Sequence, residues 1–397
     1  MTFRTGMTVL GLLAAAAALP VLAGCSGGGG AMSAQALPSM AGTPMPSQPM
    51  DVRKFAAADR AQAARDSADR SAVLPALTIT TIGSTIDPLN GDLNPYGLDI
   101  AKTTAGLLKA GDLVVCNFND NRNDQGTGTT IVALHPHPGA TPIRIAQSGD
   151  LRGCDAIALG PTDNIWAAAF ASNHNPIVSP AGALLTTIPA FAWRHPFGEA
   201  FSPKVGPFGN GAFYESNASD GSIVRINLTS SGFTFDVIAT GFAVNGGPPG
   251  GILGPSGLQY DADRDALDVI DGADNSVTVL RHVSTIPAGG VIAHGATFTG
   301  PAAAFAQRIF AGPPLNGPIS SALLPDGHLA IGNTLDPAGT NLMVEITPAG
   351  KLVATKNVDM GASGALFGMV ADIHDPNNVK LYFNDDNDNA LKVLAKP

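Results

Sequence analysis

One pattern recurs through most of this sequence: a short apolar strand ending on an acidic or amide residue, a tight turn, and a second strand. It is clearest in residues 267–280 and 381–394, where the same number of positions separates the acidic residue from an Asp-Asn turn. Such turns between apolar strands favour β-hairpins. Further copies, the last three with insertions or degenerate strands, are residues 212–226, 113–134, 329–346 and 164–170. The repeat therefore predicts a series of antiparallel strand pairs.

Each strand pair follows another strand that carries Pro or Gly within its first three residues. Proline cannot donate a hydrogen bond within a central ladder, so it belongs at the first position of a strand. Glycine lets neighbouring strands approach closely, as crowding around the axis of a propeller requires. The clear openings are residues 94–98, 195–199 and 254–258, and the weaker ones are residues 153–157, 317–321 and 366–370. A fourth strand is expected downstream, as in residues 142–147, 235–240 and 351–358.

Four strands per unit and six units predict an all-β fold, a six-bladed β-propeller over residues 76–397. A seven-bladed ring remains the alternative, because the unit around residues 164–170 is poorly defined. The last unit ends at residues 391–394 without an outer strand of its own. The β-branched segment of residues 77–82 precedes the first inner strand and has no partner. We expect this N-terminal strand to complete the last blade and close the ring.

The Pro-x-Gly-Leu opening, followed by Val-Ile-Asp and then Asn-x-Val-x-Val-Leu, resembles the repeats of NHL propellers. The resemblance covers about residues 90–397 and is weakest around residues 153–170 and 317–346. It implies the propeller fold much more than an activity, because the family includes binding scaffolds, lyases and lactonase-like hydrolases.

The N-terminus predicts an address in the bacterial cell envelope. Residues 1–24 have the layout of a secretory signal peptide, with Arg4 before an apolar stretch that ends on small residues. The stretch closes on Leu22-Ala23-Gly24-Cys25, which resembles the bacterial lipobox. That resemblance implies an acylated Cys25 and attachment to a membrane through the lipid. Ser26, in place of the Asp of a retention signal, implies the outer membrane, facing the periplasm. An ordinary secretory signal is the alternative.

Residues 25–75 should form a flexible tether. Glycines 27–30 and the Pro-, Ser- and Met-rich residues 31–50 offer few large apolar groups to bury. Residues 52–72 are rich in Ala with Arg and Asp interspersed, which predicts a short helix. Because its apolar face is almost entirely Ala, we expect this helix to be solvated rather than docked.

Charge and motif content narrow the function. A net charge of −10 disfavours nucleic acid as a partner. We find no Gly-x-Ser-x-Gly elbow, P-loop or His-Glu-x-x-His motif, and only two Trp residues, too few for the repeated Trp docking motifs of quinoprotein propellers. Cys116 and Cys154 remain as an even pair in an oxidising compartment, so either a disulfide or two buried thiols is expected.

Polar residues at the strand openings and at the ends of the second strands should gather on one face of the propeller. The predicted binding face comprises Asn94, Arg152, Asp155, His195, Glu215, Asn217, Asp271, Asn333, Asp385 and Asp386. Clustered oxygens of this kind would suit Ca²⁺. Turn capping explains the same residues more simply, so we predict no metal site and no cofactor.

Two functions remain. The favoured one is a lipid-anchored scaffold that binds a protein, a glycan or a small ligand and catalyses no reaction. The alternative is a metal-dependent lactonase-type hydrolase or a streptogramin-lyase-like enzyme. That enzyme would need a Glu with Asp and Asn side chains converging on the axis, and only Asp155, Glu199 and Asn94 lie near the strand openings.

Overall fold

The computed structural model describes residues 51–66, 71–188, 193–203, 211–230, 232–334, 341–373, 375 and 378–397. The predicted signal peptide and Cys25 lie outside these residues. In the described part of the chain, no helix is both long enough and apolar enough to cross a membrane.

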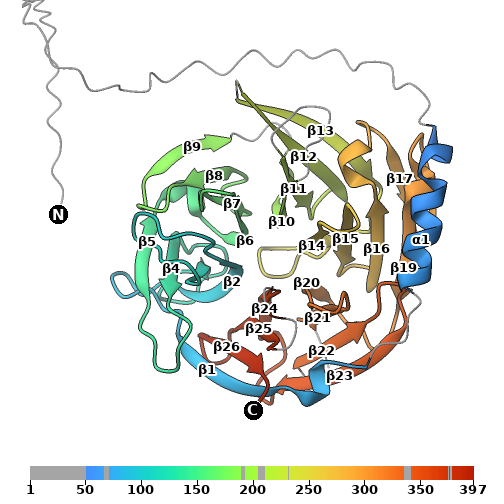
Figure 1. Cartoon of the computed structure of the whole chain (residues 1–397). Helices are drawn as coiled ribbons and strands as arrows, with labels where there is room; N and C mark the ends of the chain where they lie inside the picture. The colour runs from blue at the N-terminus through green and yellow to red at the C-terminus, as the bar shows by residue number, and fades with distance from the viewer. Residues whose placement is uncertain are drawn as a thin grey trace, which may run out of the picture. The chain divides into compact units, whose positions relative to one another are not determined.

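The described chain forms six sheets, antiparallel except where β17 pairs parallel with β13, and Figure 1 shows them arranged as the blades of a propeller around a central axis. The predicted fold is confirmed, and the seven-bladed alternative is wrong. The strands of the first three blades, from the axis outward, are β2 (Leu93–Ile100), β3 (Leu113–Asn119), β4 (Thr130–Leu134) and β5 (Ile143–Gln147), then β6 (Cys154–Leu159), β7 (Ile165–Ala169), β8 (Asn175–Val178) and β9 (Leu184–Ile188), then β10 (Pro196–Ser202), β11 (Ala212–Asn217), β12 (Ser222–Thr229) and β13 (Gly232–Thr240).

Blades 4 and 5 follow the same order, and blade 6 takes its outer strand from the N-terminal side of the ring. Their strands are β14 (Pro255–Asp261), β15 (Ala266–Asp271), β16 (Ser276–Arg281) and β19 (Ala306–Ala311), then β20 (Pro318–Leu323), β21 (Leu329–Asn333), β22 (Asn341–Ile346) and β23 (Leu352–Asp359), then β24 (Leu366–Asp372), β25 (Lys380–Asp385), β26 (Ala390–Ala395) and β1 (Thr78–Ser84). A hairpin of β17 (Val291–His294) and β18 (Thr297–Thr299) extends the sheet of blade 3.

The ring closes through β1, as predicted. This strand pairs antiparallel with β26, from Thr78 opposite Ala395 to Ser84 opposite Ala390. Ile82 is 2% exposed and packs into the core shared by the first and last blades, whereas Ile79 is 38% exposed. The last blade therefore borrows its outer strand from the start of the propeller, which leaves no open seam.

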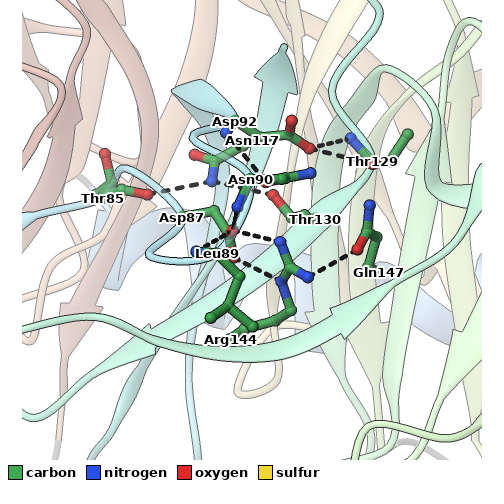
Figure 2. Close-up of polar contacts among 10 residues, drawn as sticks. All are labelled: Thr85, Asp87, Leu89, Asn90, Asp92, Asn117, Thr129, Thr130, Arg144 and Gln147. Atoms are coloured by element: carbon green, nitrogen blue, oxygen red, sulfur yellow. Dashed lines mark hydrogen bonds and ion pairs between the residues drawn. The ribbon is translucent and has the colours of Figure 1, made fainter. Parts of the chain in front are cut away.

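A polar network holds the connection between β1 and β2 (Figure 2). The buried Asp87 carboxylate accepts hydrogen bonds from the backbone of Leu89 and Asn90 and forms an ion pair with Arg144 of β5. Burial alone would raise the pKa of Asp87, but the bonds from Arg144 and the two amides outweigh it and hold the pKa below its ordinary value. The amide of Asn117 in β3 donates to the Thr85 carbonyl over 3.1 Å. These contacts attach the closing segment to blade 1.

A repeated asparagine links neighbouring blades. Asn389, Asn173 and Asn275 occupy hairpin turns with φ of 48°, 56° and 55°, a region that Asn tolerates better than most residues. The Oδ1 atom of each accepts a hydrogen bond from the backbone N–H that opens the next inner strand, at Asn94 (2.7 Å), His195 (2.9 Å) and Gly317 (2.7 Å) respectively. The turn residues thus position the strand openings of the adjacent blade.

The Ala-rich segment forms a short 3₁₀ turn, η1 (Val52–Phe55), and helix α1 (Ala56–Asp66). The helix is solvated along its length, as expected, but it also contacts the propeller, which was not expected. Phe55 packs against His282 and Phe305 with ring centroids 4.2 and 5.2 Å away, and Asp59 contacts the His282 ring over 2.8 Å. No side chain of α1 is buried, so the docking depends on Phe55, just before the helix, and on the charged side chain of Asp59 in its first turn. Figure 1 shows α1 beside β19.

A second contact ties the N-terminal segment to blade 5. The Glu345 carboxylate, which is fully buried, accepts hydrogen bonds from the backbone N–H groups of Val73 and Leu74 at 2.9 Å. The Nδ1 atom of His328 lies 2.7 Å from the Oε1 atom of the same carboxylate. Leu74 is itself buried in the core of the last two blades. The packed part of the chain therefore begins before residue 76.

Candidate functional site on the propeller axis

One repeated position brings six side chains to the axis. In each blade it directly follows the inner-strand residue after which the register with the second strand shifts, namely Pro95, Cys154, Pro196, Pro255, Pro318 or Leu366. A β-bulge of this kind re-aims a side chain. The six residues, here called the inner ring, are Tyr96, Asp155, Phe197, Ser256, Ile319 and Phe367. Asp155 is the only charged member of the inner ring.

Small residues next to the inner ring let the blades crowd together. A Cβ atom on Gly97 would lie 2.8 Å from the backbone nitrogen of Ile157 in blade 2, and one on Gly198 would lie 2.5 Å from the Ser256 carbonyl oxygen in blade 4. Both contacts are shorter than a real Cβ can make, so these positions exclude a side chain.

The next ring comes from the second strands. In each blade, one residue of the second strand pairs with the inner-strand residue just before the inner-ring residue. The residue that follows this partner is a member of what we call the outer ring: Phe118, Phe170, Ala218, Gly272, Thr334 and Asp386. Phe118 stacks on Tyr96 at a centroid distance of 4.3 Å, and Tyr96 stacks on Phe367 at 3.8 Å. Asp386 is the only charged member of the outer ring.

The two rings enclose a cavity of about 140 Å³, which we call the mouth. Its walls are mainly apolar, and its polar groups come from Asn94, Gln125, Asp155, Thr334 and Asp386. No Lys or Arg is among the described residues that line it. A smaller cavity of about 70 Å³ lies on the axis and shares Tyr96, Asp155, Phe197, Ile319 and Phe367 with the mouth. Asp155 therefore lies where the two cavities meet.

Asp155 is a buried acid without a partner. Its side chain is 5% exposed, and neither carboxylate oxygen accepts a hydrogen bond. Burial raises its pKa well above the ordinary value. Burial also raises the pKa of Asp386 to about 6, with a contribution from Asp385. The Oδ1 atom of Asn94 is buried and also lacks a donor. A buried polar atom that makes no hydrogen bond is costly, so three unpartnered oxygens at one cavity indicate a place for a ligand.

A pair of glutamates lies beside the axial cavity, within blade 3. Asn175 donates to Glu199 over 3.2 Å and also to Glu215. Burial raises the pKa of both carboxyl groups well above the ordinary value, and the charge of Glu199 adds to the shift of Glu215. Only Glu199 of this pair lines the cavity. The acids of the axial cavity are Asp155 and Glu199, and no amide side chain is among its lining residues.

The structure places three of the ten predicted binding-face residues at the mouth and the other seven outside its lining. Asn94, Asp155 and Asp386 line the mouth. His195 stacks on Phe170 of the outer ring at 4.5 Å, and the exposed Arg152 is absent from the lining. The remaining five bond to strands or connecting segments of the same or a neighbouring blade and do not line the mouth: Glu215, Asn217, Asp271, Asn333 and Asp385.

Backbone capping explains three of these five, and an ion pair holds a fourth. Asn217 accepts a hydrogen bond from the backbone of Arg194, Asp271 from Ala243 and Asn333 from Asn316, while Asp385 binds Lys392. Their positions are each followed directly by a residue of the outer ring. The ring positions are therefore offset by one residue from the positions that turn chemistry makes conspicuous.

Cys116 and Cys154 form a disulfide in the structure, with their Cα atoms 6.0 Å apart. The bridge joins the second strand of blade 1 to the opening of blade 2, directly before Asp155. It therefore fixes the backbone on which the unpartnered acid is carried.

Comparisons with known proteins do not assign an activity to this chain. No protein-family model and no curated protein matches the chain. Among solved structures, a catalytically inactive virginiamycin B lyase from Staphylococcus aureus with quinupristin is 15% identical over 80% of this chain and 99% of that chain, with a TM-score of 0.47.

Two further solved structures are similar at the same level. A nidogen/laminin complex is 15% identical over 70% of this chain and 85% of that one, with a TM-score of 0.49. A structural genomics protein of unknown function from Bacteroides thetaiotaomicron is 9% identical over 81% of this chain and 76% of that one, with a TM-score of 0.49. At such identities and TM-scores, these similarities carry no argument about function.

Proposed function

We propose that this protein is a lipid-anchored binding scaffold of the bacterial cell envelope, held through Cys25 to the outer membrane and facing the periplasm, and that its mouth is the binding site. The lipobox-like Leu22-Ala23-Gly24-Cys25 supports the anchor. The unpartnered carboxylate of Asp155 inside an aromatic cavity is the observation that carries the binding site.

The size of the mouth limits what it can hold. Pockets for drug-sized ligands usually measure about 300–1,000 Å³. A cavity of about 150 Å³ holds a group the size of benzene, and the mouth has about 140 Å³. The mouth therefore suits one side chain or terminal group of a larger partner, or a very small ligand.

A metal-dependent hydrolase or lyase is the second candidate, since Asp155 and Glu199 both line the axial cavity. Among the described residues, however, neither acid belongs to a group of three His, Cys, Asp or Glu side chains close enough to share an ion. The binding function accounts for the mouth without requiring a third ligand.

Blocking the mouth should abolish binding. Gln125 is exposed and lies at the rim, so Gln125→Trp covers the opening without entering the core. Fragments that bind the wild-type protein in ligand-observed NMR should lose their signal with this variant and keep it with Leu89→Trp, a matched change at a residue that is 73% exposed and does not line the mouth.

Fragment binding that survives Gln125→Trp would contradict the proposed site. A different result would favour the second candidate: lactonase or lyase turnover by the purified protein, with a melting temperature that falls by several degrees in EDTA and recovers with calcium.

A further inference from the structure

The ionisable groups of the mouth are acids, and no basic side chain among the described lining residues balances them. Each ring of six residues contributes one charged side chain, and both are acids, Asp155 and Asp386. Most acids elsewhere in the blades have a cationic or backbone partner. For example, Asp385 pairs with Lys392 at 2.7 Å and Asp236 with Arg225 at 2.7 Å. Asp155 has neither, although it is 5% exposed.

The walls of the mouth do not suit a metal ion. Calcium takes six to eight oxygen ligands, whereas the mouth is lined largely by aromatic and aliphatic side chains. Within the described residues, the acid-rich clusters close enough to share an ion lie elsewhere, and both already have partners. Lys392 occupies one of them, between Asp385 and Asp388. The backbone N–H groups of Val73 and Leu74 donate to Glu345 in the other.

We propose that the mouth binds an organic cation with a short apolar stem, an alkylammonium or alkylguanidinium group whose charge meets Asp155 and whose carbons contact the aromatic walls. This inference rests on the mouth being the binding site. The two unpartnered oxygens of Asp155 provide acceptors for a charge-assisted hydrogen bond. The cavity volume of about 140 Å³ matches a head group with a stem of a few carbons. A lysine or arginine side chain of a partner and a free amine carry the same chemistry.

The binding should depend on pH. Burial raises the pKa of Asp155, so in the empty mouth this carboxyl group keeps its proton to a higher pH than an exposed aspartate does. A bound cation favours the carboxylate, so binding releases protons and affinity falls as the pH is lowered. The other titratable groups that line the two cavities with Asp155 are Tyr96, Glu199 and Asp386. They are acids or a phenol, so none of them supplies a competing positive charge.

Titration calorimetry on the intact protein tests this inference. We expect n-butylamine or n-butylguanidine to bind saturably, 1-butanol of similar size to bind at least about tenfold more weakly, and butyrate not to bind. Asp155→Asn keeps the shape and removes the charge, so it should weaken cation binding about tenfold or more. Asp386→Asn should weaken it less, because that side chain is partly exposed. Asp124→Asn, at an exposed acid beside the rim residue Gln125, is the matched control and should leave the affinity unchanged.

Melting temperatures of the variants separate lost binding from lost folding, and Asp386→Asn keeps the test available if Asp155→Asn is unstable. The Nα-acetyl amides of lysine and arginine, whose charged side chains stay free, identify the source of the cation. If they bind about as tightly as the free amine and guanidine, the partner is a protein side chain. If only the free cations bind, the ligand is a small molecule. Equal binding of 1-butanol, or unchanged affinity in both Asp variants, would overturn the inference. If neutral fragments bind the wild-type protein and lose binding with Gln125→Trp, the proposed binding site stands even though the preference for cations does not.

Discussion

Deleting residues 76–86 should abolish the cooperative thermal transition of this protein. The deletion removes β1 (Thr78–Ser84), which completes the sheet of the last blade, and leaves the edge of β26 unpaired. It also removes Leu77 and Ile82, each 2% exposed. Loss of one such side chain costs about 2–5 kcal/mol, and whole domains are stable by only about 5–15 kcal/mol. Circular dichroism melting measures the effect directly.

A pair of single substitutions separates ring closure from the loss of chain length. Ile82→Ala should lower stability by about 3 kcal/mol because Ile82 packs between the first and last blades. Ile79→Ala lies on the same strand but is 38% exposed, so it should cost less than about 1 kcal/mol. An unchanged melting temperature in the deletion would show that the propeller does not need β1.

The second large effect concerns the disulfide. Replacing Cys116 and Cys154 together by Ala should lower the free energy of unfolding by about 3–4 kcal/mol, the chain-entropy value for the loop that the bridge closes. The bridge spans 38 residues and joins two neighbouring blades. Denaturant unfolding measures the change, and thiol titration of the unfolded wild-type propeller without reductant should detect no free thiol.

The reduced wild-type protein is the matched control for the double variant. Reductant should shift the unfolding midpoint of the wild type toward that of the variant and should leave the variant unchanged. Two titratable thiols in the unreduced wild type would rule out the bridge in solution. Because Asp155 follows Cys154 directly, the double variant should also bind cations less tightly if the bridge fixes the mouth.

The blade pattern was predictable because each unit carries its own local signals. Proline or glycine opens most inner strands, and an acidic residue and a tight turn separate the next two, so the repeat determines the fold even though single strands are short. The closing strand of residues 77–82 was also predictable. This β-branched segment had no partner in the repeat pattern, and the last blade was the one that lacked an outer strand. The docking of α1 was not. It depends on Phe55 and on residues far away in the sequence such as His282, whereas the helix itself consists almost entirely of alanine and charged residues.

The mouth was only partly predictable for a geometric reason. Sequence patterns identify the capping positions Asn217, Asp271 and Asn333, which turn chemistry makes conspicuous. The side chains that reach the axis follow one residue later, and they include ordinary aromatic residues such as Phe118 and Phe170. Aligning the six openings would have revealed the inner ring and its single acid, because each opening carries one variable residue before a small residue, and Pro precedes that variable residue in four of the six. The unpartnered state of that acid requires the three-dimensional structure.

Fluorine NMR of protein labelled with para-fluorophenylalanine tests the central claim most directly, that ligands enter the mouth on the axis. The aromatic walls include Phe118, Phe170, Phe197 and Phe367, whereas Phe305 packs in the separate core beneath α1. Resonances are assigned by replacing each Phe with Leu, and the protein is titrated with n-butylamine. The account predicts saturable shifts of the four mouth resonances, no shift of Phe305, and loss of the shifts in Asp155→Asn. Saturable shifts confined to Phe305 or other phenylalanines outside the mouth would place the binding site elsewhere and contradict it.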